Sequence, residues 1–353
     1  MENLFPETLP LSANVALFLL AAGLVWFSGT RMVYYGDEMA ERFGITREFV
    51  GLFFLATATE LPEIVTTLTA AAAGNANLVM GNMFGGVTMQ TAILAVADIF
   101  VVHRALTSWP RKPTHALEAV FLIIFLNVLL IFTIFKEIPL TRTVGLGAFL
   151  LFVGYPLTIW VLRRYDMRST WTPIDIPEES EGAAVLIGAR TLAGWGTGRL
   201  IGHALIAALA ILVAGYVTAD RAGVIAEQTG LSASFMGIAF LAAATSTPEL
   251  STTIAAARIG AYTMAISNIF GSNLIMLALI LPADLVYRRG PILAEADQVA
   301  QISIVTGVIV TAIYVAGLLI RRTPRMFGAG VDSLLVLAIY IGSLFVLYRL
   351  QSG

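Results

Sequence analysis

The sequence predicts an all-α integral membrane protein whose ten transmembrane helices form two inverted repeats of five helices each. Three observations lead to this fold class. Of the 353 residues, 58% are hydrophobic and 12% are charged, whereas a soluble domain has roughly a quarter charged residues. The apolar residues form blocks of about 20, the length that crosses roughly 30 Å of hydrocarbon as a helix. The third observation is that part of the first half is repeated in the second.

The ten apolar blocks are the expected membrane spans. They comprise residues 12–34, 48–73, 77–101, 115–135, 143–163, 199–219, 234–258, 262–286, 299–320 and 330–349. An even number of spans places both termini on one side of the membrane. We therefore expect a first five-helix repeat at 1–163, a cytoplasmic linker at 164–198 and a second five-helix repeat at 199–353.

The linker at 164–198 is the longest polar stretch of the chain. It contains Pro173, Pro177 and the acidic residues Glu178, Glu179 and Glu181, a composition typical of a connector. It is shorter than the roughly 50 residues of the smallest typical domains. No built-in regulatory domain is therefore expected, and no obligatory protein partner is evident.

The distribution of positive charge predicts the orientation in the membrane. With the N-terminus outside, the inner side carries fifteen of the 21 Lys and Arg residues and the outer side carries six, as the positive-inside rule favours. The first ten residues contain Glu2 and Glu7 but no basic residue, which argues against a cleaved signal peptide. We expect a multi-pass protein of the cell (inner) membrane with its N-terminus outside.

The duplication is visible without gaps. A shift of 186 residues aligns residues 40–98 with residues 226–284, and 23 of the 59 pairs are identical. Because each half has an odd number of spans, the second copy enters the membrane from the opposite face. Inverted repeats of this kind are typical of transporters that bind their substrate between the two halves.

Each copy carries a polar stripe at helical spacing. The stripes contain Thr59, Glu60 and Glu63 in the second span, and Thr245, Ser246 and Glu249 in the seventh. Pro62 and Pro248 precede the last glutamate of each stripe. Because proline has no N–H to donate, each one frees a carbonyl one turn earlier and favours a helix break in mid-membrane.

These side chains predict a site for hard cations. Carboxylates, hydroxyls and freed carbonyls suit calcium, sodium or magnesium, whereas zinc and copper prefer His or Cys. The chain has no cysteine, and its three histidines lie near predicted span ends. A carboxylate in hydrocarbon has to face a cavity, a partner or an ion. If Glu63 and Glu249 meet, their repulsion favours a divalent cation between them or a proton on one of them.

The third and eighth spans are expected to supply a second wall. Its polar or small residues are Asn82, Gly85, Gly86 and Gln90 in one helix, and Asn268, Gly271 and Ser272 in the other. The amides either bind the ion or only join helices, and the sequence leaves both roles open for Asn82, Asn268 and Gln90. Asp98 and Asp284 match each other at the far ends of these helices, where we expect a solvated or gate-associated role.

At these residues the sequence resembles the calcium/cation antiporter superfamily, the group of sodium/calcium and proton/calcium exchangers. The motifs that carry the resemblance are Ala-Thr-Ala-Thr-Glu-Leu-Pro-Glu at 56–63 with Gly-Asn-Met-Phe-Gly-Gly at 81–86, and Ala-Thr-Ser-Thr-Pro-Glu at 244–249 with Ser-Asn-Ile-Phe-Gly-Ser-Asn at 267–273. The resemblance covers nearly all of the chain and implies an antiporter with its cation sites between the second, third, seventh and eighth helices.

The resemblance also implies roles for single residues. Glu63 and Glu249 match the family's paired calcium-binding glutamates, and Thr59, Thr245 and Ser246 its hydroxyl ligands. Ala56 and Ala242 match the positions that offer backbone carbonyls, and Ser272 matches a sodium-ligating serine.

Four residues depart from the family pattern. Glu60 replaces a small hydroxyl residue, Gly86 replaces the serine that corresponds to Ser272, Gln90 replaces a shorter polar residue, and Met276 replaces a polar or acidic one. The candidate ion-binding set still includes Glu60 and Gln90. These changes leave the counter-ion open between Na⁺ and H⁺.

The preferred prediction is thus a secondary cation antiporter that exchanges Ca²⁺ for Na⁺ or H⁺, with an exchanger that does not carry Ca²⁺ as the alternative. Its expected partners are the lipid bilayer and metal cations, with no nucleic acid and no cofactor. A channel would need a pore, usually built by oligomeric symmetry. An intramembrane hydrolase would need a nucleophile with a base or a His-rich metal site, and no histidine lies near the glutamate stripes.

Overall fold

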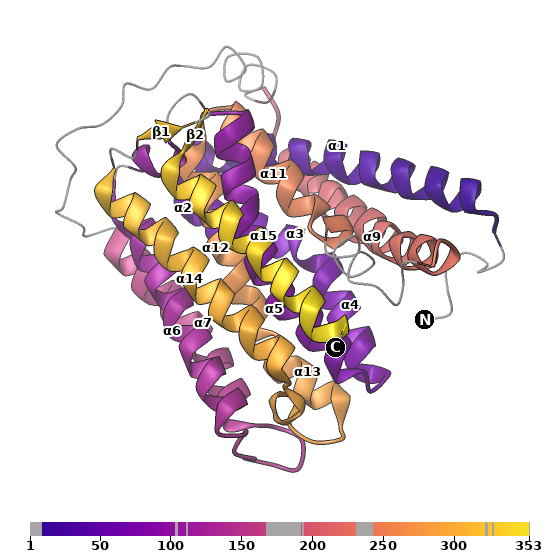
Figure 1. Ribbon diagram of the computed structural model, residues 1–353. Helices are drawn as coiled ribbons and strands as arrows, with labels where there is room; N and C mark the ends of the chain where they lie inside the picture. Colours follow the sequence, from indigo (N-terminus) through magenta and orange to yellow (C-terminus); the bar gives the residue numbers. More distant parts are fainter. Residues whose placement is uncertain are drawn as a thin grey trace.

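The computed structural model describes residues 9–102, 105–110, 112–166, 192, 194–230, 243–321, 324–326 and 328–352. Figure 1 shows a helical bundle in which α1 and α9 lie side by side, at an angle to the remaining helices.

The first half begins with a long helix, followed by a broken second span. Its elements are α1 (Leu11–Phe43), α2 (Arg47–Phe49), the π-helical turn η1 (Val50–Leu55), α3 (Ala56–Thr59), α4 (Leu61–Ala72), α5 (Ala76–Phe100), the short η2 (Leu106–Ser108), α6 (Thr114–Ile134) and α7 (Leu146–Asp166). α1 ends at Gly44, which has a left-handed φ of 62° and whose N–H bonds back to the helix.

The second half follows the same order. Its elements are α9 (Thr197–Gln228), α11 (Thr247–Arg258), α12 (Tyr262–Ala278), α13 (Ile280–Tyr287), the short η3 (Ile292–Glu295), α14 (Gln298–Ile320), β1 (Arg325–Met326), β2 (Ala329–Gly330) and α15 (Val331–Ser352). The sequence did not predict the hairpin of β1 and β2, in which Met326 pairs antiparallel with Ala329. The predicted eighth span consists of α12 and α13 joined at Leu279.

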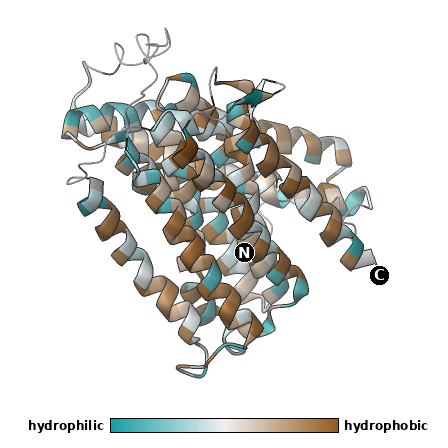
Figure 2. Cartoon of the chain, turned by 60° about the vertical axis from the view of Figure 1, so that its left-hand side comes forward, coloured by the Kyte–Doolittle hydropathy of each residue, from teal (hydrophilic) through white to brown (hydrophobic). Residues whose placement is uncertain are grey.

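The predicted all-α membrane fold is confirmed. Within the described residues, eight helices are long and apolar enough to span a membrane, and the pair Arg47–Thr59 and Leu61–Ala72, bent by 47°, makes a ninth. The predicted seventh span, 234–258, lies partly outside the described residues and is seen only from residue 243 onward. Apolar residues cover the outward faces of the helices in mid-molecule (Figure 2), where lipid chains would contact them.

Two predicted spans were too short. α1 has 33 residues and α9 has 32, whereas the sequence predicted 12–34 and 199–219. At 1.5 Å per residue each helix is about 50 Å long, so each must tilt to fit roughly 30 Å of hydrocarbon. α7 also runs on to Asp166, into the predicted linker, of which residues 167–191 and 193 lie outside the described residues.

Two aspartates at opposite ends of the bundle show the inverted symmetry. Asp98 accepts backbone hydrogen bonds from Leu106 at 2.6 Å and Gly330 at 2.7 Å. Its counterpart Asp284 accepts them from Ile292 at 2.7 Å and Gly145 at 2.9 Å. Both aspartates are fully buried, so the expected solvated role is wrong.

Each aspartate therefore fastens two chain segments to the end of its own helix. The first segment lies eight residues after the aspartate, at Leu106 or Ile292. The second is the start of the last helix of the opposite half, which is α15 for Asp98 and α7 for Asp284. The aspartates act as structural clasps between the halves.

Glycines let α1 and α9 approach the centre closely. A Cβ added at Gly215 of α9 would lie 2.6 Å from Cγ of Pro62, and one added at Gly29 of α1 would collide with Ser251. Gly29 and Gly215 are themselves 186 residues apart. The two long helices thus cross the broken spans of the opposite half by the same kind of contact.

The main apolar core adjoins the broken spans, since it includes Ala70 and Ala71 of α4 and Ala257 of α11. Buried residues of α5, α6, α12 and α14 also belong to it, including Phe84, Leu126, Phe270 and Tyr314. The rings of Phe270 and Tyr314 pack edge to face with centroids 5.6 Å apart. This core packs α5 against α12 and α14, and α12 against α6.

Candidate cation site

The two broken spans place their glutamates at equivalent points. α4 begins at Leu61, directly after a break at Glu60, and α11 begins at Thr247, directly after a break at Ser246. Each helix has its proline in the first turn, where the missing N–H is tolerated. Glu63 and Glu249 also lie in these first turns, where the helix dipole favours negative charge.

Three carboxylates come together in the interior. Glu60 and Glu249 are completely buried, and Glu63 is 2% exposed. Glu249 lies within electrostatic range of both Glu60 and Glu63. Among the described residues, no Lys or Arg side chain forms an ion pair with any of the three. Their negative charge therefore calls for a cation or proton from outside the chain.

Most oxygens of this group lack a donor. Among the described residues, none donates a hydrogen bond to Oε2 of Glu60, to either carboxylate oxygen of Glu63 or Glu249, or to Oε1 of Gln90. Buried polar atoms are nearly always satisfied in native proteins. An oxygen-coordinated cation would complete such a cluster of unsatisfied acceptors.

Polar neighbours surround Glu60 at the break of the second span. Nε2 of Gln90 donates to Oε1 of Glu60 at 2.6 Å, which joins α5 to the break in the second span. The hydroxyls of Thr59 and Ser272 lie 3.4 Å apart, and Thr59 also donates to the carbonyl of Ala56 at 3.3 Å. The structure thus brings Thr59, Glu60, Gln90 and Ser272 together across three helices.

The two asparagines mainly join helices. The side-chain amide of Asn82 donates to Thr67 at 2.9 Å, and that of Asn268 donates to Thr252 at 3.1 Å. Each bond ties the third or eighth span to the glutamate helix beside it. The carbonyl oxygen of Asn268 is buried without a donor, so this residue retains an oxygen that could face an ion.

The remaining predicted residues that the structure describes are buried. Ala56 is fully buried, and Thr245 and Ser246 are 6% and 3% exposed. Ala242, the predicted carbonyl donor of the second half, lies outside the described residues.

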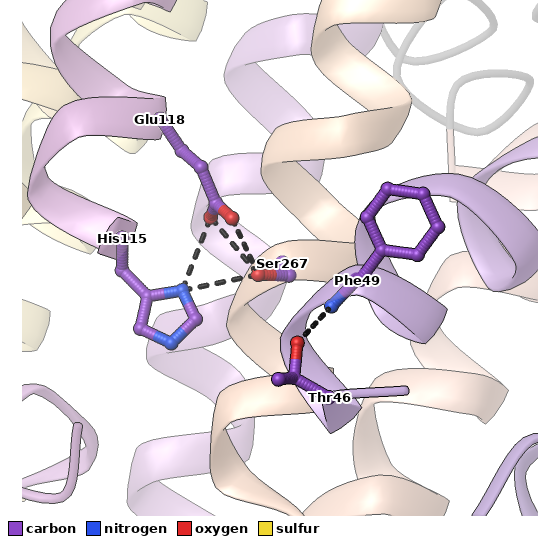
Figure 3. Close-up of polar contacts among 5 residues, drawn as sticks. All are labelled: Thr46, Phe49, His115, Glu118 and Ser267. Carbon is purple, nitrogen blue, oxygen red and sulfur yellow. Dashed lines mark hydrogen bonds and ion pairs between the residues drawn. The ribbon is translucent and has the colours of Figure 1, made fainter. Parts of the chain in front are cut away.

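Sequence reasoning missed a second buried polar cluster next to this wall. Figure 3 shows Glu118 and His115 of α6 converging on Ser267 of α12. The Ser267 hydroxyl lies 2.7 Å and 3.0 Å from the two oxygens of Glu118, and Nδ1 of His115 lies 3.1 Å from Glu118. All three residues are at most 1% exposed.

This cluster fixes α6 to the site helix α12, since Ser267 directly precedes Asn268. The same view shows the N-cap of α2, where Thr46 accepts from the backbone of Phe49. The signal for the cluster was present in the sequence as His and Glu three residues apart on one helix face, but its partner Ser267 could be found only in three dimensions.

Two related halves that meet at a buried carboxylate site define a secondary transporter of cations. Residues 13–161 and 200–349 match the model of the family described as sodium/calcium exchanger protein. The chain belongs to this family, which is one of transporters and not of enzymes.

Several individual proteins are similar to the chain. The inner membrane protein YrbG of Escherichia coli is 25% identical over 324 residues, covering 91% of this chain and 92% of YrbG. CaxA of Alkalimonas amylolytica, named as a candidate antiporter, is 27% identical and covers 95% of this chain and 99% of its own length. The solved sodium-calcium exchanger NCX_Mj shares the fold with a TM-score of 0.67 at 18% identity, covering 95% of this chain and 99% of its own.

Proposed function

We propose that this protein is a secondary active antiporter that exchanges Ca²⁺ for Na⁺ or H⁺ by alternating access. The proposed cation ligands are the residues that the sequence predicts in the second, third, seventh and eighth spans. They are Ala56, Thr59, Glu60, Glu63, Asn82, Gln90, Ala242, Thr245, Ser246, Glu249, Asn268 and Ser272.

The observation that carries this proposal is the set of unsatisfied oxygens of Glu60, Glu63, Gln90 and Glu249. Carboxylate and amide oxygens are the ligands that Ca²⁺ prefers, and several carboxylates in one site favour a divalent over a monovalent ion. In the absence of Ca²⁺, sodium ions or protons would balance the same charge. This competition for one set of oxygens is the physical basis of exchange.

The moving parts in this proposal are α1 and α9. They cross the broken spans through Gly29 and Gly215, so little side-chain interlocking opposes sliding. The walls formed by α5 and α12 belong to the main core. Alternating access would then be a sliding of the α1/α9 pair across a fixed centre, which opens the site to one side at a time.

The membrane placement is part of the proposal. The chain is a multi-pass membrane protein, and its relative YrbG is an inner membrane protein. We infer the same membrane for this chain, with the N-terminus outside and a cytoplasmic linker at 164–198 between halves at 1–163 and 199–353.

The test is uptake of radioactive calcium by vesicles that contain the purified protein, driven in turn by an outward sodium gradient and an outward proton gradient. We expect one gradient to drive uptake, and Glu63→Gln and Glu249→Gln each to abolish it, because each change removes a charged oxygen ligand. Glu41→Gln, the same chemical change at an exposed position, should transport normally.

The result also decides between the two kinds of exchanger. No calcium uptake under either gradient, by protein that is folded, would reject the calcium proposal. Sodium uptake driven by a proton gradient, measured in the same vesicles, would then support an exchanger that does not carry Ca²⁺.

A further inference from the structure

The two halves of the cation site are not equivalent. Their sequences agree at Thr59 and Thr245 and at Glu63 and Glu249, but three positions of the central site differ between the copies. Glu60 corresponds to Ser246, Gly86 corresponds to Ser272, and Gln90 corresponds to Met276. An inverted repeat would otherwise build two equal half-sites, so these three changes must alter one half relative to the other.

On one side the changes produce a connected polar group, which we call the glutamate lobe and which consists of Thr59, Glu60, Gln90 and Ser272. Gln90 donates to Glu60 at 2.6 Å, and Ser272 lies beside Thr59 at 3.4 Å and near Glu60. All four residues are fully buried. Oε2 of Glu60 and Oε1 of Gln90 remain without donors, so this lobe offers free oxygen ligands next to Glu63 and Glu249.

On the other side the equivalent space is less polar, because a methyl group replaces the amide and one hydroxyl. We call this the methionine lobe, and its described residues are Gly86, Thr245, Ser246 and Met276. A Cβ added at Gly86 would lie 2.5 Å from the terminal methyl carbon of Met276. The Met276 methyl therefore packs where the counterpart of the Ser272 side chain would be. Met276 is fully buried and belongs to the main apolar core.

The two substitutions on this side depend on each other. A serine at position 86 would have to displace the flexible end of Met276, while a glycine without Met276 would leave a void beside the site. A thioether is also a poor ligand for Na⁺ and Ca²⁺, which prefer oxygen. The methionine lobe thus lacks one hydroxyl and gains a methyl group at the point where a second cation would be held.

We propose that the central site is one-sided: a single hard divalent cation binds on the side of the glutamate lobe, where Glu60 and Gln90 offer oxygens beside Glu63 and Glu249, and Met276 packed on Gly86 excludes a second cation. This inference rests on the proposed function and adds its ligand set and ion number. Met276 and Gly86 are the residues that determine this specificity, and Glu60 is an additional ligand that the second half lacks.

The test is displacement of radioactive calcium by Na⁺ from purified, detergent-solubilised protein at equilibrium. We expect one calcium ion per chain and a displacement curve with a Hill coefficient of about 1, because only one monovalent ion can compete on the single open lobe. The double variant Gly86→Ser/Met276→Asn restores polar groups to the methionine lobe, and its Hill coefficient should rise toward about 2.

Glu60→Gln should weaken calcium binding by at least about tenfold without changing the number of calcium ions bound, as expected for loss of one charged ligand. Met276→Ala opens the methionine lobe without adding a ligand and tests the steric part alone, so it should also steepen displacement. Met264→Ala removes another fully buried methionine from the same helix and should leave the Hill coefficient unchanged.

The outcomes separate this inference from the proposed function. Calcium binding by the unaltered protein with a Hill coefficient of about 2 or more for Na⁺ would overturn the one-sided site while leaving calcium exchange intact. A second calcium ion per chain would do the same. Folded protein that binds no calcium would overturn both.

Discussion

The buried acidic side chains of this protein differ mainly in whether hydrogen-bond donors contact their carboxylate oxygens. Both oxygens of Asp98 and of Asp284 accept backbone hydrogen bonds, so these residues are structural. The oxygens of Glu63 and Glu249 are equally buried but have no donors among the described residues. Since unsatisfied buried charge is costly, the second pair needs a cation or protons to balance it, which is what the proposed ion-binding role supplies.

Glu137, in the loop between α6 and α7, is an intermediate case. Its Oε1 accepts from the backbone of Gly147 at 2.8 Å and of Ile138 at 3.1 Å, and the residue is 8% exposed. Burial raises the pKa of Glu137 above its ordinary value, although these backbone donors oppose the shift. The folded protein therefore takes up a proton at this carboxyl group at a higher pH than the unfolded chain does.

The resulting prediction concerns stability against pH. The stabilisation linked to Glu137 is fully present below the pKa of the unfolded chain and is lost as pH rises through the higher pKa of the folded state. Glu137→Gln should therefore flatten the dependence of the thermal unfolding temperature on pH above the ordinary pKa of a glutamate. Thermal unfolding in detergent measures this, with Glu41→Gln at an exposed position as the control. An unchanged pH profile in Glu137→Gln would contradict the prediction.

At the scale of elements, the contact between α9 and the broken second span is one that the proposed sliding of α1 and α9 has to cross. Gly215 lies against Pro62 with room for a hydrogen atom but not for a methyl group. By comparison, Gly202 in the same helix has open space around it. The same substitution at the two positions therefore separates an effect on sliding from an effect on helix propensity.

We predict that Gly215→Val slows ion exchange in the vesicle assay by about tenfold or more, since overpacking costs about 1–3 kcal/mol and 1.4 kcal/mol corresponds to tenfold. Gly202→Val should exchange at nearly the normal rate. Thermal unfolding of both variants checks that they are folded. Equal rates for the two variants would show that this contact does not limit the motion.

For the whole molecule, the clasps of Asp98 and Asp284 tie each half to the last helix of the other at opposite ends of the bundle. The halves are thereby interlocked and not merely adjacent. With the N-terminus outside, the clasp of Asp284 and the loop around Thr141 face outward, and the start of α9 faces the cytoplasm.

The absence of cysteine makes this orientation directly testable. Thr141→Cys and Gly194→Cys each place a single thiol at an exposed position. We predict that a membrane-impermeant maleimide labels Thr141→Cys in intact cells and labels Gly194→Cys only after permeabilisation. The opposite pattern would reverse the orientation, and labelling of both in intact cells would contradict the arrangement of spans.

The sequence by itself determined the membrane fold, the duplication and the glutamate stripes, because hydropathy, a fixed shift of 186 residues and helical spacing are all local or periodic properties. It also identified Glu60, Gly86, Gln90 and Met276 as unusual. Only the tertiary structure shows how these four residues pair: Gln90 donates a hydrogen bond to Glu60, and the Met276 methyl group packs against Gly86. Pairing between helices depends on rotation and depth in the bundle, which no single helix encodes. For the same reason only the structure could show that Asp98 and Asp284 are buried clasps and that His115 and Glu118 reach Ser267.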